Sequence, residues 1–475
     1  MDFSWKILID LGAISLSLLI ATYLRSRVKF LQTYLVPNAL TAGVFLLVFY
    51  NFVAPAIGMR QEGLGELVYH LLSISFIAMT LRKTPERKRS DRIFTTSIGV
   101  LSQYALQATA GLLVVLLLTS TILPDLFPAF GWLLPLGFVL GPGQAFAIGT
   151  GWERLGFEGA GTIGLTVAAI GFLWACFGGV YLINHGIRRG WVDAEDIGFL
   201  KNRGARTGIQ PAGGDLPVGA RLTTESEAID SMSFNIAMVF GTYLATYLFL
   251  RLATYLLSFA GNLGTELATN LWGIGFVFAA IIAIVVKKTL GALKGDGLLD
   301  NGSLTRISGT AVDVMVSASI GAISIVVVSQ YWLPLLILTT VGGTMTILTV
   351  PWIASRLFLD VRFQRMLIIY GASTGTMPTG LALLRVVDPD FQTAAASDYM
   401  YSTGFTFVLA IPLILAINLP AYSVTRENPT LFWVALGVSL AYVLSVTIGY
   451  ALIARRRGVQ DARSIWLASE KERAG

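Results

Sequence analysis

Cysteine, histidine and charged residues are all scarce in this chain, and each shortage excludes a class of protein or site. Cys176 is the single cysteine, so no internal disulfide can form. The two histidines, His70 and His185, lie far apart in the sequence, so no Cys/His cluster has the spacing of a metal site. Charged residues make up 13% of the chain, whereas soluble domains carry about 25%. An ordinary soluble domain is therefore excluded.

The sequence gives little support for covalent catalysis or nucleic-acid binding. A Gly-x-Ser-x-Gly pattern occurs at 371–375, but it lies inside an apolar broken stretch with no strand expected before it, whereas a nucleophile elbow needs a strand-to-helix turn. The Gly-Gly-Asp sequence at 213–215 falls in a polar segment. The net charge of +6 comes from basic residues clustered in short loops between apolar runs. We therefore expect neither an enzyme nor a nucleic-acid partner, and we expect no organic cofactor.

Apolar residues are abundant, at 55% of the chain with a mean hydropathy of +0.70. Many runs reach the roughly 20 residues that cross a bilayer. The sequence predicts an all-α polytopic membrane protein with about 11 transmembrane helices. The first run has no basic region in front of it and no small-residue cleavage site behind it, so we expect a retained span rather than a signal peptide. The expected spans are 4–24, 34–53, 65–82, 93–121, 160–187, 234–258, 266–286, 308–328, 333–357, 398–420 and 429–453.

Basic residues alternate between the loops and predict the orientation of the chain. One set of loops carries nearly all of them, and this set is expected to be cytoplasmic. The N-terminus is then outside and the C-terminus inside. The basic clusters of this set are Arg25/Arg27/Lys29, Arg82/Lys83/Arg87/Lys88/Arg89/Arg92, Arg188/Arg189, Lys287/Lys288/Lys294, Arg356/Arg362/Arg365 and Arg455/Arg456/Arg457.

The chain divides into two similar halves around a polar linker. Each half is expected to hold five spans and one glycine-broken stretch. Three short segments of weak sequence similarity occur in the same order in both halves. Because the halves start on opposite sides, they read as an inverted-topology repeat. The expected segments are 1–189 with a re-entrant hairpin at 129–152, the cytoplasmic linker 190–232, 233–422 with a hairpin at 366–386, and 423–475 with an extra helix and a basic tail.

The two broken stretches, "LGPGQAFAIGTG" and "YGASTGTMPTG", are the strongest functional signal. Irregular backbone at membrane depth is tolerated where protein buries it or where it lines a wet cavity. Matched broken segments in inverted halves are the best sequence indication of a transport site. The alternative is that these glycines only allow close helix packing. The predicted substrate-binding residues are Gly141, Pro142, Gly143, Gln144, Ala145, Ser373, Thr374, Gly375 and Thr376.

Further polar residues within the spans are candidates for ligand contact. Asn38 and Asn270 hold matched positions, where an amide binds a carboxylate or Na⁺ or caps a broken helix. Arg385 follows the second stretch and either meets a substrate carboxylate or is another cytoplasmic charge. An intramembrane carboxylate is a functional candidate by default, although Asp313 is expected close to the cytoplasmic interface. The candidate Na⁺ ligands are Thr374, Thr376, Thr379, Asp313 and Ser317.

The same stretches resemble the bacterial sodium/glutamate symporter family. The resemblance rests on "LLPLGFVLGPGQAFAIGTGWE" and "YGASTGTMPTGLALLRVVDPDF", with "YLVPNALTAG" and "AAIGFLWACFGGVYLINHG" in agreement. In the first stretch, Pro142 stands where better-known members have a glycine. The resemblance implies two inverted five-span repeats, a homodimer in the bacterial inner membrane and an elevator-type movement. It also implies Na⁺-coupled uptake of glutamate or a related carboxylate, with Na⁺ as coupling ion and membrane lipid as surroundings.

Two alternatives stay open from the sequence. One is a transporter of another organic anion, such as a hydroxycarboxylate or a dicarboxylate, coupled to protons. The other is an ion channel, whose filter would be formed by the two re-entrant stretches. Saturable, uphill flux separates a transporter from a channel, and Na⁺ dependence separates the two transporters.

Overall fold

The computed structural model describes residues 5–34, 36–83, 90–191, 207–209, 218–259, 261, 268, 271–272, 275–384, 386–388 and 393–467. Within these ranges every regular element is a helix. Ten of the described segments are long and apolar enough to cross a membrane by length and composition. The chain is therefore an all-α, multi-pass membrane protein, as the hydropathy predicts. Much of the predicted linker, at 192–206 and 210–217, lies outside the described residues.

The first half contains three helical stretches, one long helix and then the first broken stretch. Its helices are α1 (Lys6–Arg27), α2 (Lys29–Thr33), α3 (Asn38–Val48) with its continuations η1 (Phe49–Val53) and η2 (Ala54–Ile57), α4 (Glu62–Leu81), α5 (Ser90–Thr121), η3 (Pro128–Trp132), α6 (Leu133–Pro135), η4 (Leu136–Leu140), α7 (Pro142–Glu153), α8 (Ala160–Leu173), η5 (Trp174–Gly178) and α9 (Gly179–Arg188).

The second half has the same order of long helices, broken stretch and final helix. Its helices are α11 (Ser231–Ser258), α13 (Gly275–Ala292), η8 (Asp296–Leu298), α14 (Asn301–Gly321), α15 (Ile325–Gln330), α16 (Trp332–Leu357), α17 (Arg362–Thr374), α18 (Met377–Leu384), α19 (Ala395–Ala416) and α20 (Leu419–Thr425). One further helix, α21 (Thr430–Ala454), follows with its 3₁₀ extension η9 (Arg455–Val459).

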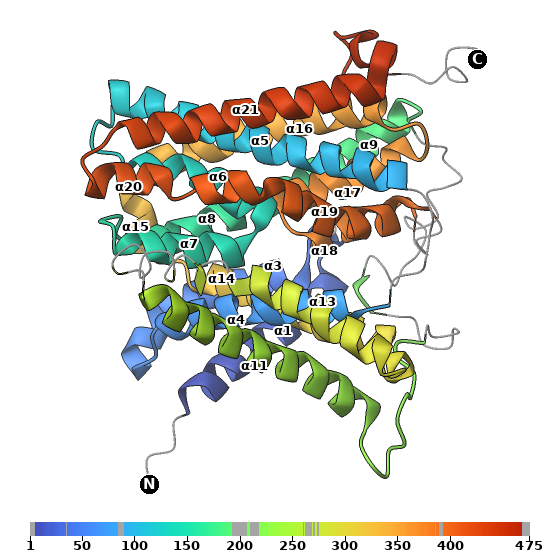
Figure 1. Ribbon diagram of the computed structural model, residues 1–475. Helices are drawn as coiled ribbons and strands as arrows, with labels where there is room; N and C mark the ends of the chain where they lie inside the picture. The colour runs from blue at the N-terminus through green and yellow to red at the C-terminus, as the bar shows by residue number, and fades with distance from the viewer. Residues whose placement is uncertain are drawn as a thin grey trace.

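The helices form two layers (Figure 1). The six-helix layer contains α1, α3, α4, α11, α13 and α14, in which α14 packs on α4 and α3 while α4 packs on α13. The hairpin layer contains α5–α9 and α16–α21, including both broken stretches. Each half of the chain thus contributes its first three long helices to one layer and the rest to the other.

Glycines on both sides bring the two layers together. A Cβ atom on Gly143 of α7 would lie 2.6 Å from Leu72 of α4, and one on Gly65 of α4 would lie 2.1 Å from Phe146 of α7. Each layer therefore offers a glycine to a large apolar side chain of the other. These contacts join the layers through apolar surfaces.

The eighth predicted span, 308–328, corresponds to the helix α14 at 301–321, which is not among the ten segments long and apolar enough to cross a membrane. The side chain of Asp300 caps α14 by accepting a hydrogen bond from the Ser303 backbone at 2.7 Å. After the helix, the Asn51 amide donates to the Ile323 carbonyl at 2.9 Å and accepts from the Ile325 backbone at 3.1 Å. The prediction was wrong because the polar residues that start α14 resemble a loop. Asp313 consequently lies twelve residues after the first residue of the helix, Asn301, rather than near the start of the helix.

The segment after α21 folds back onto the hairpin layer. Arg356 of α16 is fully buried and donates to the backbone carbonyls of Asp461 and Ser464, both at 2.8 Å. Trp466 stacks on Trp191 with ring centroids 4.6 Å apart. The described part of the predicted basic tail is therefore packed against the ends of α9, α16 and α17.

Candidate functional site

The first broken stretch reverses the chain at Gly141. The π-helical turn η4 ends at Leu140, and Gly141 adopts φ 89° and ψ 178°, a conformation that side chains disfavour. Pro142 then occupies the first turn of α7, where a missing N–H costs nothing. The Gly141 carbonyl accepts the first helical hydrogen bond, from Ala145, at 3.2 Å. The "LGPG" sequence is thus the tip between two half-helices, as predicted from its glycines and proline.

The second broken stretch has the same plan with different chemistry. Helix α17 ends at Thr374, Gly375 and Thr376 form the tip, and α18 begins at Met377. Gly371 and Gly380 let the two half-helices approach, since a Cβ on Gly371 would lie 2.7 Å from the Gly380 Cα. This stretch is therefore also a helix–tip–helix hairpin.

The two tips meet. A Cβ on Gly141 would lie 3.2 Å from the Thr376 methyl carbon and 3.8 Å from the Gly375 carbonyl oxygen. Helix α8 completes the contact, because a Cβ on Gly171 would lie 2.3 Å from the Thr374 carbonyl oxygen. Both predicted tips therefore form one site in the hairpin layer, although about 230 residues of sequence separate them.

Four helix ends of two kinds converge at this site. Helices α7 and α18 begin there, so their first N–H groups and the positive ends of their dipoles face the contact. Helix α17 and the η4 turn end there with carbonyl groups. Helix starts suit an anion, and helix ends with nearby hydroxyls suit a small cation. The arrangement can hold a carboxylate and a cation side by side.

Gln144 is the one predicted side chain at the first tip with an unused polar atom. It is 2% exposed, and its Oε1 atom has no hydrogen-bond partner among the described residues. The Cβ position of Gly141 lies 3.9 Å from this oxygen. Its position beside the contact between the tips leaves this unsatisfied acceptor available to a ligand.

The other predicted tip residues serve packing and backbone geometry. Gly143 accommodates Leu72, and Ala145 is fully buried with its carbonyl against Gly164. The Thr374 hydroxyl donates to the Tyr370 carbonyl at 2.8 Å within its own helix. The Thr376 and Thr379 hydroxyls lie 3.2 Å apart, which leaves two adjacent oxygens for a cation. Of the predicted residues, Gly141, Gln144, Gly375, Thr376 and Thr379 surround the contact between the tips.

The predicted residues of the six-helix layer lie elsewhere. The Asn38 amide donates to the Thr22 hydroxyl at 2.9 Å, so it joins the start of α3 to α1. Ser317 is fully buried and donates to the Ala39 and Asp313 carbonyls, so it joins α14 to α3. It lies away from the tips, and its role as a Na⁺ ligand stays a prediction. Asn270 and Arg385 lie outside the described residues.

Sequence reasoning missed Gln107 on α5. This side chain is fully buried and donates through Nε2 to the Ser373 carbonyl at 2.9 Å and to the Thr346 hydroxyl at 3.0 Å. It thereby fixes the last turn of α17 against α5 and α16. Gln107 lies more than 260 residues from Ser373 in the sequence. A single sequence contains no signal for a contact between residues so far apart.

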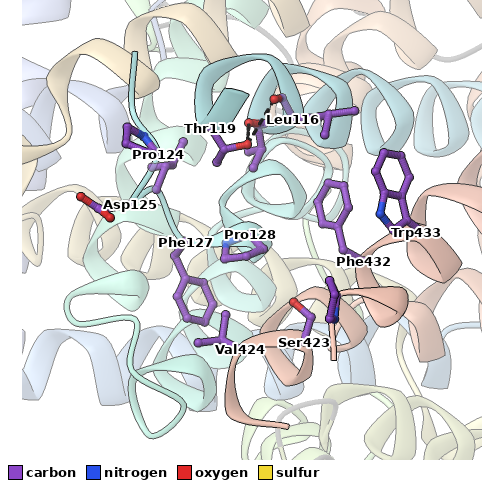
Figure 2. A pocket seen from close by; sticks show the side chains of 13 residues that line it. Leu116, Thr119, Pro124, Asp125, Phe127, Pro128, Ser423, Val424, Phe432 and Trp433 are labelled. Atoms are coloured by element: carbon purple, nitrogen blue, oxygen red, sulfur yellow. Dashed lines mark hydrogen bonds between the residues drawn. The ribbon is translucent and has the colours of Figure 1, made fainter. Parts of the chain in front are cut away.

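A separate cavity of about 450 Å³ lies between α5, the loop before η3, and α20–α21 (Figure 2). Phe127, Pro128 and Phe432 surround it, and the Thr119 hydroxyl bonds to its own helix at Val115 and Leu116. None of the predicted site residues lines this cavity. The candidate site is therefore the contact between the tips.

Comparisons of the chain with protein-family models, with curated proteins and with solved structures return no match. The family resemblance of the tip sequences consequently stays a prediction.

Proposed function

We propose that the protein is a secondary active transporter for a small carboxylate, driven by an ion gradient. The observation that carries this proposal is the meeting of Gly141 with Gly375 and Thr376, where two helices begin beside the unpaired Gln144 oxygen. The N–H groups and positive dipole ends would hold the carboxylate, and the Thr376 and Thr379 hydroxyls would contribute to the cation shell.

The two layers support an alternating-access mechanism of the elevator type. The hairpin layer would move as a unit along the six-helix layer, with the tips as cargo site. The contacts of Leu72 with Gly143 and of Phe146 with Gly65 are apolar and contain no hydrogen bond or ion pair that sliding must break. The matching order of helices in both halves agrees with an inverted repeat, which would give two related end states.

The cargo and the coupling ion follow from the resemblance of the tip sequences. On this basis we propose Na⁺-coupled symport of glutamate or a related carboxylate in a bacterial inner membrane, with the C-terminus cytoplasmic and the functional unit a homodimer. A hydroxycarboxylate or dicarboxylate coupled to protons is the alternative within the same mechanism.

Uptake into liposomes tests this function. With an inward Na⁺ gradient, purified protein should accumulate labelled glutamate, or another carboxylate from a panel, against its concentration gradient, and the uptake rate should saturate with substrate concentration. Neither should occur when choline replaces Na⁺. Gln144→Glu should weaken apparent substrate affinity at least about tenfold, because its negative charge repels the carboxylate. Gly151→Ala is the control, since no atom lies near that position.

Two outcomes would contradict parts of the proposal. Flux that does not saturate and runs only downhill would identify a channel. Unchanged affinity in a folded Gln144→Glu variant would remove the first tip from the substrate site.

A further inference from the structure

The cavity between α5 and α20–α21 lies where three apolar helical segments end on the same side of the hairpin layer. Its described lining comes from the last turns of α5, the last turn of α20, the first turn of α21 and the loop before η3 (Figure 1 and Figure 2). The segments 91–121, 408–425 and 430–459 are each long and apolar enough to cross a membrane. Because membrane spans end at the bilayer surface, the cavity lies at the level of a membrane interface.

The wall of the cavity continues into the outer apolar surface of the protein. Trp433 and Val424 line the cavity and are 54% and 45% exposed. Leu117, next to the lining residue Leu116, is 61% exposed. In a membrane, exposed apolar surface of this kind faces hydrocarbon, and tryptophan is frequent at the interface. Lipid is therefore the medium next to the cavity.

The interior of the cavity offers water few hydrogen-bond partners. The Thr119 hydroxyl donates to the Val115 carbonyl at 2.9 Å, and the Ser423 hydroxyl donates to the Pro420 carbonyl at 2.7 Å, so both donors are used within their own helices. Apart from Asp125, the remaining described side chains of the lining are aliphatic, proline or aromatic. A buried water needs two to four polar partners. A cavity of about 450 Å³ with this lining therefore suits an apolar occupant.

Asp125 gives one edge of the cavity a negative charge. Its side chain is exposed, and Figure 2 shows it at the edge rather than among the aromatic rings. Arg426 follows the lining residue Val424 closely in sequence, but its guanidinium lies over the Tyr422 ring, 5.2 Å from the centroid. No basic residue belongs to the described lining. This edge therefore favours a cationic group over an anionic one.

We propose that the cavity is a binding site for one membrane phospholipid with an amine headgroup. One acyl chain occupies the apolar interior, and the amine lies at the interface beside the Asp125 carboxylate. The site is separate from the contact between the tips, and lipid binding requires no transport, so the inference does not rest on the proposed function.

The lipid would support the loop that leads into the first broken stretch. Phe127 and Pro128 of this loop line the cavity, and Phe127 stacks on Phe157 with ring centroids 4.8 Å apart. Phe157 is fully buried in the loop that follows α7. The segments before and after the first broken stretch thus meet beside the cavity. An acyl chain covers apolar surface of this loop and stabilises it.

A photoreactive lipid tests the site without any transport assay. Full-length protein in nanodiscs receives phosphatidylethanolamine with a diazirine in one acyl chain, and labelled peptides are mapped by mass spectrometry. Peptides from 115–128 and 423–433 should carry the label. Thr119→Phe should reduce this labelling at least about fivefold, because the new ring excludes the chain. Ser120→Phe is the matched control, since Ser120 is exposed beside Thr119 and is not part of the described lining.

Stability supplies a second measurement. Added phosphatidylethanolamine should raise the unfolding midpoint of delipidated wild-type protein and of Ser120→Phe, but not that of Thr119→Phe, because only an occupied site stabilises the folded state. If Thr119→Phe does not accumulate, Val424→Trp replaces it, with Thr425→Trp as control.

Competition between unlabelled lipids tests the headgroup. Phosphatidylethanolamine should displace the photoreactive lipid about threefold better than phosphatidylglycerol, which is the effect expected of an exposed ion pair. Asp125→Asn should abolish this preference.

Three results would overturn the proposal or part of it. Equal labelling of the two peptides in Thr119→Phe and Ser120→Phe would overturn the lipid site. Crosslinks that join two copies of the protein at these peptides would make the occupant a second copy instead. A preference for phosphatidylethanolamine that survives Asp125→Asn would overturn the role of the carboxylate. Uptake enters none of these measurements, so this inference and the proposed function fail separately.

Discussion

The two broken stretches share a plan but are held in place by different means. The first packs through close backbone approaches: a Cβ on Gly131 would lie 2.4 Å from the Gly111 carbonyl oxygen, and one on Gly164 would lie 2.6 Å from that of Ala145. The second is held by side chains. Tyr370 donates to the Trp174 carbonyl at 2.8 Å, and Gln107 donates to the Ser373 carbonyl at 2.9 Å.

This difference indicates a division of labour between the tips. Backbone packing at glycines positions the first stretch without using the polar side chain at its tip, so the Gln144 oxygen stays unpaired among the described residues. In the second stretch, side-chain bonds from α5 and to η5 fix the end of α17. The second tip is thus held in place by side-chain hydrogen bonds, whereas the first tip carries a side chain, Gln144, with an unpaired oxygen.

The buried arginine just before the second stretch, near the start of α17, provides the largest test of this comparison. Arg365 is 1% exposed and pairs with Asp398 of α19 at 2.7 Å. Arg365→Met should destabilise the protein by about 3–5 kcal/mol, because it leaves a buried carboxylate without its partner. The measurement is the apparent unfolding midpoint in detergent. The double variant Arg365→Met/Asp398→Leu should recover much of the loss, and equal loss in both would mean that the pair is not the anchor.

A methyl group in the first stretch tests backbone packing. Gly131→Ala should cost about 3 kcal/mol, since the new carbon would overlap the Gly111 carbonyl and force the chains apart. Gly151→Ala on α7 has open space and should be neutral or stabilising by up to about 1 kcal/mol, as alanine favours the helix. Unfolding midpoints of the two variants that differ by less than their error would refute the importance of glycine packing.

Sequence alone predicted the local parts of this site but not its long-range anchors. The half-helices and tips were predicted from Gly141, Pro142 and Gly375, because clustered glycine, proline and hydroxyl residues favour a break in a helix. The loop arginines were predicted to be cytoplasmic charges, yet Arg356 and Arg365 are buried and bound to partners. Counting charges cannot distinguish a solvated arginine from one whose partner lies far along the chain. The start of α14 was likewise missed, because polar residues that cap and line a helix resemble a loop.

Substitution of Gln107 tests whether side-chain hydrogen bonds hold the second tip in place, with a smaller expected loss of stability. The Ser373 carbonyl accepts only, and the Thr346 hydroxyl donates to the Gly342 carbonyl at 2.8 Å. The amide must therefore point its nitrogen at both groups. Gln107→Met should cost about 2 kcal/mol, because a buried carbonyl loses its donor. Thr346→Val removes one of the two acceptors and should cost less. A midpoint unchanged in Gln107→Met would show that Ser373 needs no donor.

Gln144 should show the smallest effect on stability and a large effect on transport. Both glutamines are buried, and Oε1 of each lacks a partner among the described residues. They differ in the amide nitrogen. That of Gln107 donates to Ser373 and Thr346, whereas no hydrogen bond within the described residues holds the Gln144 amide. Gln144→Met should therefore change stability by less than about 1 kcal/mol, and in the stabilising direction, since an unsatisfied oxygen is removed. Uptake should still fall about tenfold or more, because the cargo loses the polar amide as a partner. Paired measurements of unfolding midpoint and uptake on the two methionine variants separate the roles. A stable Gln144→Met protein with normal uptake would remove this side chain from the cargo site, and a strongly destabilised one would make the first tip a frame like the second.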